Sequence, residues 1–469
     1  MKGNWYYLPV EIRAMILEEV ARQRHCGWAS FAAVSREWQA VLEPRNFLTL
    51  KLRISCLEDM EHMINRSAHM VRRIWLHIEL PRYTCRSCLG MESKSWSYRH
   101  NNIVKDAIVK LFSILSSWKP RDRLVLELSG YTPSDMEHKL NPRAFEPGSH
   151  FHDPKHDWHN GIQTWLTDCD IRRLFSSFFH RPPEELLQVP AVTDLVMRRR
   201  FRRHMHPAGV RRIVECLPRL QNLVYEPWRH CDMRLKATRD TGMYMEAMII
   251  SILEDFNEDV QLGLVAGGAV PAYEDFPFCF ELAGALALRS CSLDHLSVSY
   301  MLCARQFFEN CRHSYNWEHL QSLALTSPSL TPTGNRELIN GLLLTAGRAA
   351  LRMPKLEDLA LWNGKRGESC AFIYHKGRQT RDEASLTWRG TWDFNLDEVA
   401  TWWQRNLAAV QVRYERLQKE VIHSHGDAIY YLRLPRDVID PESLRQIRQE
   451  GMLGGAAAFH GVIGEATEL

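Results

Sequence analysis

Residues 48–54 read Leu-Thr-Leu-Lys-Leu-Arg-Ile, an alternation of apolar and polar side chains that predicts a β-strand. Apolar residues at helical spacing from Leu57 to Ile64 predict a helix directly after this strand. From Ile74 to Leu80 the alternation returns and predicts a second strand. The segment is therefore a strand-helix-strand unit.

The same order continues along the chain. Apolar spacing predicts a helix from Ile103 to Leu115, and alternation predicts a strand from Leu124 to Leu128. Further short strands are expected at Asp194–Met197, Asn222–Tyr225, Leu293–Val298, Leu320–Leu325 and Leu356–Leu361. Because parallel strands need helical crossovers, this order predicts an α/β fold.

Three of these strands are entered through a Leu-x-x-Leu motif. The motif ends at Leu223 in Leu217-Pro218-Arg219-Leu220-Gln221-Asn222-Leu223, at Leu323 in the segment from Trp317, and at Leu359 in the segment from Met353. These units resemble irregular leucine-rich repeats, and the resemblance implies an open curved array. The intervals between the last leucines, 100 and 36 residues, are unequal, so a doubly wound α/β domain remains the alternative.

An open array would present a broad concave surface with loops along its rim. We expect two such loops, Tyr83 to His100 and Ser327 to Asn335, to contact a binding partner. The array should span residues 49–365. Residues 366–450 are expected to hold a strand pair, Ala371 to His375 and Ala384 to Arg389, and a capping helix from Leu396 to Val421, before a loose tail at 451–469.

Two short amphipathic helices are expected at the N-terminus. Pro9 suits the first turn of one, which runs to Val20, and the second runs from Trp28 to Leu42 with one apolar face. The sequences Leu8-Pro9-Val10-Glu11-Ile12, Ile16-Leu17 and Ala33-Val34-Ser35-Arg36-Glu37-Trp38 resemble the F-box family over about residues 5 to 48. A helical hairpin packed against the rest of its own chain is the alternative.

The resemblance implies a function. An F-box over residues 1–48 would dock on an Skp1-type adaptor, and through it on a cullin, while the array captures a protein target for ubiquitination. The residues that would enter the adaptor's groove or brace the helices are Leu8, Pro9, Ile12, Ile16, Leu17, Val34 and Trp38. This is recognition of helices by a groove, and it needs no catalytic residue or cofactor. We therefore expect an adaptor that is not an enzyme.

Composition agrees with an intracellular protein. The 469 residues are 45% hydrophobic and 25% charged, with a formal net charge of +3, which is typical of a globular chain and selects no polyanionic partner. The start lacks a signal peptide, and no stretch is apolar enough for a membrane span. Twelve scattered cysteines suit reduced thiols. The cytoplasm or nucleus, with no membrane contact, is the expected location.

Two motifs suggest metal chemistry. Cys85-x-x-Cys88 has the spacing of a zinc knuckle, but no second Cys-x-x-Cys or His-x3-His pair supplies the other ligands of a structural site. Residues 150–159 gather His150, His152, His156 and His159 with two aspartates in one segment. Neither motif is complete, so the sequence predicts no metal, with a weak site in the histidine segment as the alternative. A Gly-x-Ser-x-Gly elbow and a P-loop are absent.

Basic charge is concentrated in one region. Residues 181–236 carry twelve Lys or Arg against six Asp or Glu, including Arg198, Arg199, Arg200, Arg202 and Arg203. A solvated helix face, a contact for an acidic partner or phosphorylated target, and nucleic-acid binding are the three interpretations. Nucleic acid is not expected as a partner. The wider alternatives are a scaffold acting outside a ligase and a nucleic-acid binder that uses this patch.

Overall fold

The computed structural model describes fifteen stretches of the chain. They are residues 5–23, 27–63, 67–88, 90–120, 122–138, 150–156, 158–159, 162–163, 173, 176–199, 203–226, 261–265, 278–377, 384–407 and 410–453. The predicted α/β class is confirmed, because helices alternate with strands through most of these stretches. None of the described helices combines the length and apolarity that a membrane crossing requires.

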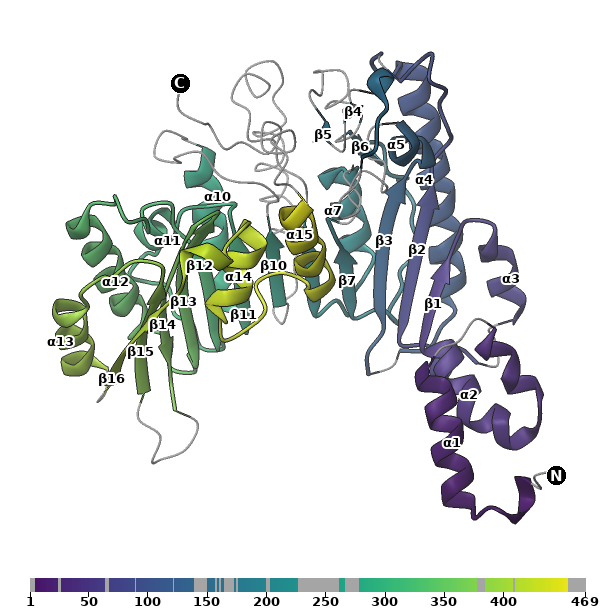
Figure 1. Ribbon diagram of the computed structural model, residues 1–469, viewed down its shortest axis with the longest axis horizontal. Helices are drawn as coiled ribbons and strands as arrows, with labels where there is room; N and C mark the ends of the chain where they lie inside the picture. The colour runs from purple at the N-terminus through teal and green to yellow at the C-terminus, as the bar shows by residue number, and fades with distance from the viewer. Residues whose placement is uncertain are drawn as a thin grey trace.

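One sheet of twelve strands runs through the molecule (Figure 1). In spatial order it comprises β1 (Thr49–Leu52), β2 (Arg73–Glu79), β3 (Val125–Tyr131), β7 (Asp194–Met197), β9 (Asn222–Tyr225), β10 (Gln261–Val265), β11 (His295–Ser299), β12 (Ser322–Thr326), β13 (Asp358–Lys365), β14 (Glu368–His375), β15 (Ala384–Gly390) and β16 (Val410–Arg416). From β1 to β13 neighbouring strands are parallel. The hairpin of β13 and β14 then reverses the direction, and β15 and β16 pair in parallel.

The spatial order of these strands is their order in the chain. A doubly wound sheet instead reverses its order at a switch point, where its two halves diverge. Among the described strands no such reversal occurs. Each parallel connection therefore moves one strand further along, and the sheet grows in one direction.

A row of apolar residues in matching register explains why these short strands form. The residues in register across the parallel strands are Leu50, Ile74, Leu126, Leu195, Leu223, Leu262, Leu296, Leu323 and Leu359. Leu195, Leu323 and Leu359 are fully buried. In the Leu-x-x-Leu motif the first leucine is buried before the strand begins, as Leu320 is, and the second joins this row.

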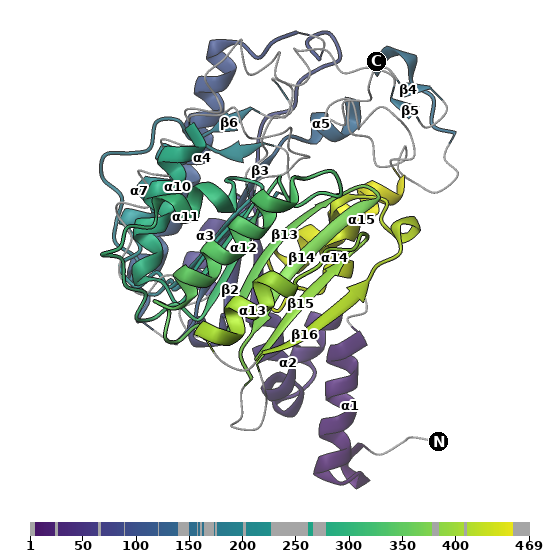
Figure 2. The ribbon, with the colours of Figure 1, turned by 90° about the vertical axis from the view of Figure 1, so that its left-hand side faces the viewer.

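Helices cover the face of the sheet to which that row points. They are α3 (Cys56–Met63), α4 (Lys94–Ser116), α7 (Pro207–Glu215), α10 (Phe278–Arg289), α11 (Ala304–Asn310), α12 (Arg336–Ala350) and α13 (Asp397–Asn406). Figure 2 shows α10, α11 and α12 on one side of the sheet, and α14 (His425–Leu432) and α15 (Pro441–Leu453) on the other. In α12 the side chains of Ile339, Leu343 and Ala346 are buried at helical spacing.

The C-terminal segment returns across the middle of the sheet. Helix α14 packs on β13 and β14, where a Cβ on Gly364 would meet the Cβ of Ala428 at 2.6 Å. Before α15, Ser299 in β11 donates a hydrogen bond to the carbonyl of Val438 at 3.2 Å. Just after β9, Glu226 accepts hydrogen bonds from the Asp440 amide and the Ser443 hydroxyl. An open concave surface was expected here, but the chain itself covers this part of it.

The predicted capping helix from Leu396 to Val421 is wrong. Helix α13 ends at Asn406, and residues 410–416 form β16, the last strand of the sheet. Val410, Val412 and Tyr414 alternate with polar residues, and this period of two decides the structure. The expected boundary at residues 365 and 366 falls inside the hairpin of β13 and β14, so the sheet continues through it.

Of three smaller expectations, two change and one is confirmed. The expected loop from Tyr83 to His100 ends early, because Ser93 caps α4 by accepting a hydrogen bond from the Trp96 amide at 3.3 Å. Ser327 to Asn335 is a loop, as predicted. Helix α15 extends to Leu453, into the predicted tail, and residues 454–469 lie outside the described chain.

Short elements complete the described chain. They are the 3-10 turns η1 (Trp5–Tyr7), η3 (Ala68–Met70), η5 (Pro154–His156), η7 (Ser290–Ser292) and η8 (Lys419–Val421), helix α5 (Pro133–His138), the antiparallel pair β4 (Trp158–His159) and β5 (Ile162–Gln163), and the parallel pair β6 (Ser177–Phe178) and β8 (His204–Met205). Most of β4, β5, β6 and α5 lies beyond the carboxyl ends of β2 and β3, at the upper edge of the sheet in Figure 1.

Candidate functional site: the N-terminal helical unit

The first site begins with two helices that project from the edge of the sheet. They are α1 (Val10–Gln23) and α2 (Arg36–Leu48), joined by the 3-10 turn η2 (Trp28–Ala33). The single helix expected from Trp28 to Leu42 is wrong. Ser35 interrupts it with an extended backbone and caps α2 by accepting a hydrogen bond from the Trp38 amide at 3.3 Å.

This N-terminal unit has a small core of its own. Leu17, Ala21 and Leu42 are buried, and none of them belongs to the large core that fills the sheet and its helices. The ring of Trp38 lies 5.6 Å from that of Trp5 and 6.0 Å, edge-on, from that of Phe31. The unit therefore folds around its own contacts.

Hydrogen bonds and an ion pair hold the unit together internally, and the polypeptide itself attaches it to the sheet. Glu37 accepts a hydrogen bond from the Trp5 indole at 2.9 Å and forms an ion pair with Arg13 at 2.9 Å. Asn46 donates to the carbonyl of Ala29 at 3.0 Å, which holds η2 on α2. Helix α2 runs without a break into β1, so the unit is attached directly to the first strand of the sheet.

The surface of this unit is unusually apolar. Of the eighteen exposed large apolar side chains among the described residues, nine lie within residues 7–48, about a tenth of the chain. They are Tyr7, Leu8, Val10, Ile12, Met15, Ile16, Phe31, Val34 and Leu48. Ile12 is 41% exposed, Ile16 37% and Val34 61%. Exposed apolar side chains concentrated in this way are typical of interaction surfaces, whereas single ones scattered over a protein are ordinary.

The residues predicted to bind or brace now separate into two groups. Leu8, Pro9, Ile12, Ile16 and Val34 are exposed on the unit. Leu17, in α1, is fully buried, so it packs inside the unit. Trp38 is half-buried between two other rings and also packs inside the unit. The predicted adaptor-binding residues did not include Val10, which precedes Ile12 on α1, or Met15, which follows it as part of the same apolar stripe; both are exposed.

The arginine cluster has internal partners. Arg198 lies at the end of β7 and forms ion pairs with Glu127, Asp440 and Glu442, which tie the sheet to the start of α15. The Arg199 guanidinium lies 3.3 Å from the His425 imidazole, and its amide donates to the buried Glu226. Burial raises the pKa of Glu226, an effect partly offset by the hydrogen bonds it accepts from Ser443 and the Asp440 amide.

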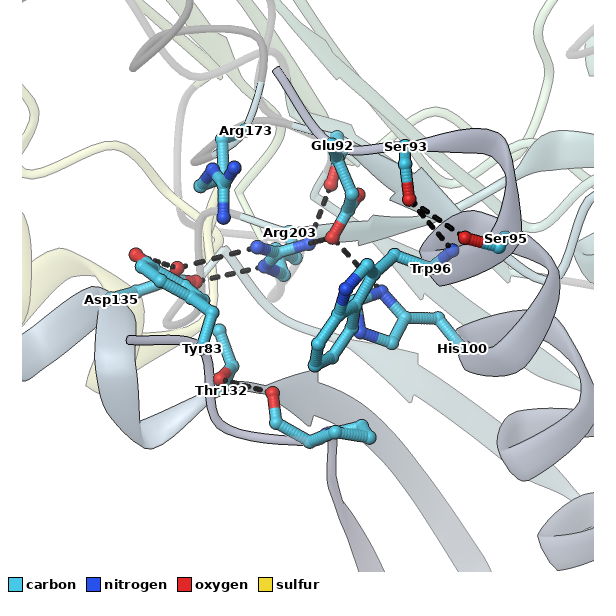
Figure 3. Close-up of polar contacts among 12 residues, drawn as sticks. Tyr83, Glu92, Ser93, Ser95, Trp96, His100, Thr132, Asp135, Arg173 and Arg203 are labelled. Carbon is cyan, nitrogen blue, oxygen red and sulfur yellow. Dashed lines mark hydrogen bonds and ion pairs between the residues drawn. The ribbon is translucent and has the colours of Figure 1, made fainter. Parts of the chain in front are cut away.

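Arg203 is the centre of a buried network at the carboxyl ends of β2 and β3 (Figure 3). Its guanidinium lies 2.8 Å from the Asp135 carboxylate and 3.3 Å from that of Glu92. The Tyr83 hydroxyl donates to Asp135 at 2.9 Å, and His100 pairs with Glu92 at 3.1 Å. Burial raises the pKa of Glu92, but the His100 hydrogen bond and the Arg203 charge outweigh it, and the pKa falls below its usual value.

The described arginines of the cluster do not form a solvated helix face, and they do not form an open contact site for an acidic partner. Arg198, Arg199 and Arg203 lie in the connection after β7, and ion pairs within the chain balance the charges of Arg198 and Arg203. Arg200 and Arg202 lie outside the described residues. At Arg198 and Arg203 the surplus of arginine in the sequence is therefore matched by carboxylates that are distant in sequence.

Three aromatic residues lie on the face of β2 and β3 opposite their helix: Trp75, which is buried, and His77 and Tyr131, which are half-buried. The ring of His77 stacks on that of Tyr131, 4.1 Å apart, and the Trp75 indole donates to the Ser129 hydroxyl at 2.7 Å. The Lys51 ammonium lies 5.0 Å from the centre of the Trp75 ring. No labelled helix lies in front of β1, β2 and β3 in Figure 1, in contrast to the middle of the sheet.

The two motifs considered for metal binding lie together. Cys85 and Cys88 follow β2, and the Cys85 sulfur lies 3.0 Å from Nε2 of the buried His156. His150 is exposed, and the rings of His152 and His159 pair with each other at 5.3 Å. The sequence did not connect the two motifs, because 71 residues separate Cys85 from His156.

Part of the chain is similar to a protein family whose function is unknown. Residues 246–440 match the model of a family of unknown function, DUF6546. In the described chain this segment includes the elements from β10 to α14, and it excludes the N-terminal unit. No curated protein matches the chain.

Proposed function

We propose that the N-terminal unit is an F-box that docks on an Skp1-type adaptor, and that the chain recruits a protein target to a cullin-RING ubiquitin ligase. The observation that carries the proposal is the concentration of exposed apolar side chains on the unit, at residues that include the predicted anchors Ile12, Ile16 and Val34. A chain that used these helices only for its own stability would bury these residues.

The free energy gained by burying these apolar side chains is large enough for binding when several of them act together. Burying a whole Ile or Val side chain contributes about 1.5–3 kcal/mol, so covering the exposed fractions of Ile12, Ile16 and Val34 contributes roughly 1 kcal/mol each. Three such contacts change a dissociation constant roughly 150-fold. The separate core of the unit allows this surface to be occupied without rearranging the sheet.

The remainder of the chain suits a receptor. We propose that β1 to β13 form an irregular leucine-rich-repeat-like array, supported by the unreversed strand order and the aligned leucine row. The target surface we propose is the face at the half-buried His77 and Tyr131, because α14 and α15 cover the middle of the same face. Aromatic side chains with a polar atom are favoured at protein interfaces.

We place the protein in the cytoplasm or nucleus, where such ligases act. The described cysteines, eight in all, are free thiols, which accords with a reducing compartment. No role in catalysis is proposed for this chain, and a scaffold that uses the same adaptor outside a ligase remains the second candidate, since the exposed unit alone supports both.

Co-purification tests the proposal. The full chain and an Skp1-type adaptor are mixed as purified proteins, and the complex is separated by size-exclusion chromatography. We expect a one-to-one complex with the wild type and none with the double variant Ile12→Asp, Val34→Asp. Both residues are exposed, so the variant should keep the wild-type melting temperature.

A matched control uses apolar residues of similar exposure outside the unit. Leu338, in α12, is 44% exposed, and Leu351, directly after this helix, is 48% exposed. The variant Leu338→Asp, Leu351→Asp should bind the adaptor as the wild type does. Equal loss of binding in both double variants, or a folded wild type that forms no complex, would contradict the proposed function.

A further inference from the structure

The turn after β2 and the segment 150–159 bring together three side chains that bind zinc. Sulfur atoms of Cys85 and Cys88 lie 4.0 Å apart, and Nε2 of His156 lies 3.0 Å from the first of them. All three ligand atoms lie within 4.8 Å of one another. Cys88 and His156 are buried and Cys85 is half-buried, so the cluster is largely removed from solvent.

These separations suit a tetrahedral ion. With Zn–S bonds of about 2.3 Å and Zn–N bonds of about 2.0 Å, two sulfurs at tetrahedral angles lie about 3.8 Å apart, and a sulfur and a nitrogen about 3.5 Å. The two sulfurs already have this spacing. The imidazole of His156 needs to retreat by roughly half an ångström from Cys85 to admit the ion.

The histidine is also oriented as a metal ligand. Its Nδ1 lies 2.6 Å from a carboxylate oxygen of Asp153, which leaves Nε2 directed at Cys85. A carboxylate that holds the second ring nitrogen is the usual outer partner of a zinc-bound histidine. Asp153 itself is fixed by a pair of backbone hydrogen bonds with Trp158, at 2.9 and 3.0 Å.

We propose that Cys85, Cys88 and His156 bind a Zn²⁺ ion, with Asp153 positioning the histidine and water at the fourth corner. Two thiolates and a neutral imidazole balance the charge of the ion. Bound there, the ion joins the turn that follows β2 to the segment 150–159, two parts of the chain that are distant in sequence. Its role is to stabilise this rim of the sheet, independently of the N-terminal unit.

Cobalt substitution tests the site, because tetrahedral Co²⁺ with thiolate ligands absorbs strongly in the visible and near-ultraviolet range. The full chain is purified under reducing conditions, stripped of metal and titrated with Co²⁺ alone. We expect one equivalent to bind, with sulfur-to-cobalt charge-transfer bands that Zn²⁺ abolishes on displacing Co²⁺. Circular dichroism of the stripped protein verifies that it is folded.

Variants assign the ligands. Cys85→Ser should lose the stoichiometric binding, and since Cys85 is half-buried the substitution leaves the fold intact. Asp153→Asn should keep the same spectrum with a dissociation constant about 10–100-fold higher, as expected when the partner of a ligating histidine is lost. The controls are Cys56→Ser, a half-buried thiol elsewhere, and His152→Ala, in the same segment. Both should bind as the wild type does.

Three results would overturn the proposal. A folded wild type that binds no Co²⁺ at one equivalent excludes the site. Binding that survives Cys85→Ser shows an adventitious ion only. A disulfide between Cys85 and Cys88 in protein purified under reducing conditions shows a redox pair in place of a metal site.

Discussion

Replacing Arg203 by methionine should destabilise the protein by about 3–5 kcal/mol, the usual cost of removing one partner from a buried ion pair. The guanidinium is buried and contacts Asp135 at 2.8 Å and Glu92 at 3.3 Å. Methionine fills much of the volume but leaves the buried Asp135 carboxylate and the partly buried Glu92 carboxylate without their cation. The Tyr83 hydroxyl and His100 still donate to them, which keeps the cost within this range.

A neighbouring arginine provides the control. Arg82 pairs with Glu137 at 2.7 Å, but both side chains are about half exposed, so Arg82→Met should cost no more than about 1 kcal/mol. Urea unfolding at pH 7, followed by tryptophan fluorescence, measures both variants against the wild type. An Arg203→Met variant that loses less than about 1 kcal/mol, or no more than Arg82→Met, would refute this account of the network.

The pH dependence of the difference is a second test of the same variant. In the wild type the pKa of Glu92 is lowered, so its contribution to stability is present above the unfolded pKa and is lost as pH falls through the folded value. Without Arg203 that contribution shrinks. The gap between variant and wild type should therefore narrow from pH 7 toward pH 4, and a constant gap would contradict the role assigned to Glu92.

Three further predictions concern other parts of the fold. Leu42→Ala, in the separate core of the N-terminal unit, should cost about 2–5 kcal/mol and make this unit sensitive to limited proteolysis while the sheet remains resistant. Gly364→Ala should cost about 1–3 kcal/mol in thermal unfolding, because its Cβ would lie 2.6 Å from that of Ala428, whereas Gly341→Ala in α12, with open space around it, should be neutral or stabilising. His206 caps α7 by accepting a hydrogen bond, and burial and the neighbouring His180 lower its pKa to about 4, so stability should fall from pH 6.5 to pH 4 by roughly 1–2 kcal/mol after allowance for solvent screening, a slope that His206→Asn should flatten.

Local patterns in the sequence predicted much of the sheet. The strands at Asp194–Met197 and Asn222–Tyr225 have the expected bounds, because a short apolar run bounded by turn residues is decided locally. For residues 396–421 the same reasoning predicted one helix, and this prediction is wrong. Val399, Trp402 and Trp403 at helical spacing precede an alternating run, and only pairing with β15 reveals where the helix ends.

Long-range partners explain what the sequence did not predict about the sites. The sequence alone suggests that Arg203 is a surface charge, whereas in the structure it contacts Glu92, which is 111 residues away in the chain. In the sequence, Cys85 and Cys88 form an incomplete zinc knuckle, and only the structure shows that His156 lies beside them. The exposed residues of the N-terminal unit were predictable as an apolar stripe, but their exposure was not, since Ile12 would look the same in a sequence that buried it.

The most direct test of the central claim is hydrogen exchange of the full chain, measured by mass spectrometry with and without a saturating Skp1-type adaptor. We expect new protection within residues 7–48 and little change over β7 to β13. Protection confined to the sheet, or none at any adaptor concentration that saturates a known F-box, would contradict the proposal that these helices are the docking surface.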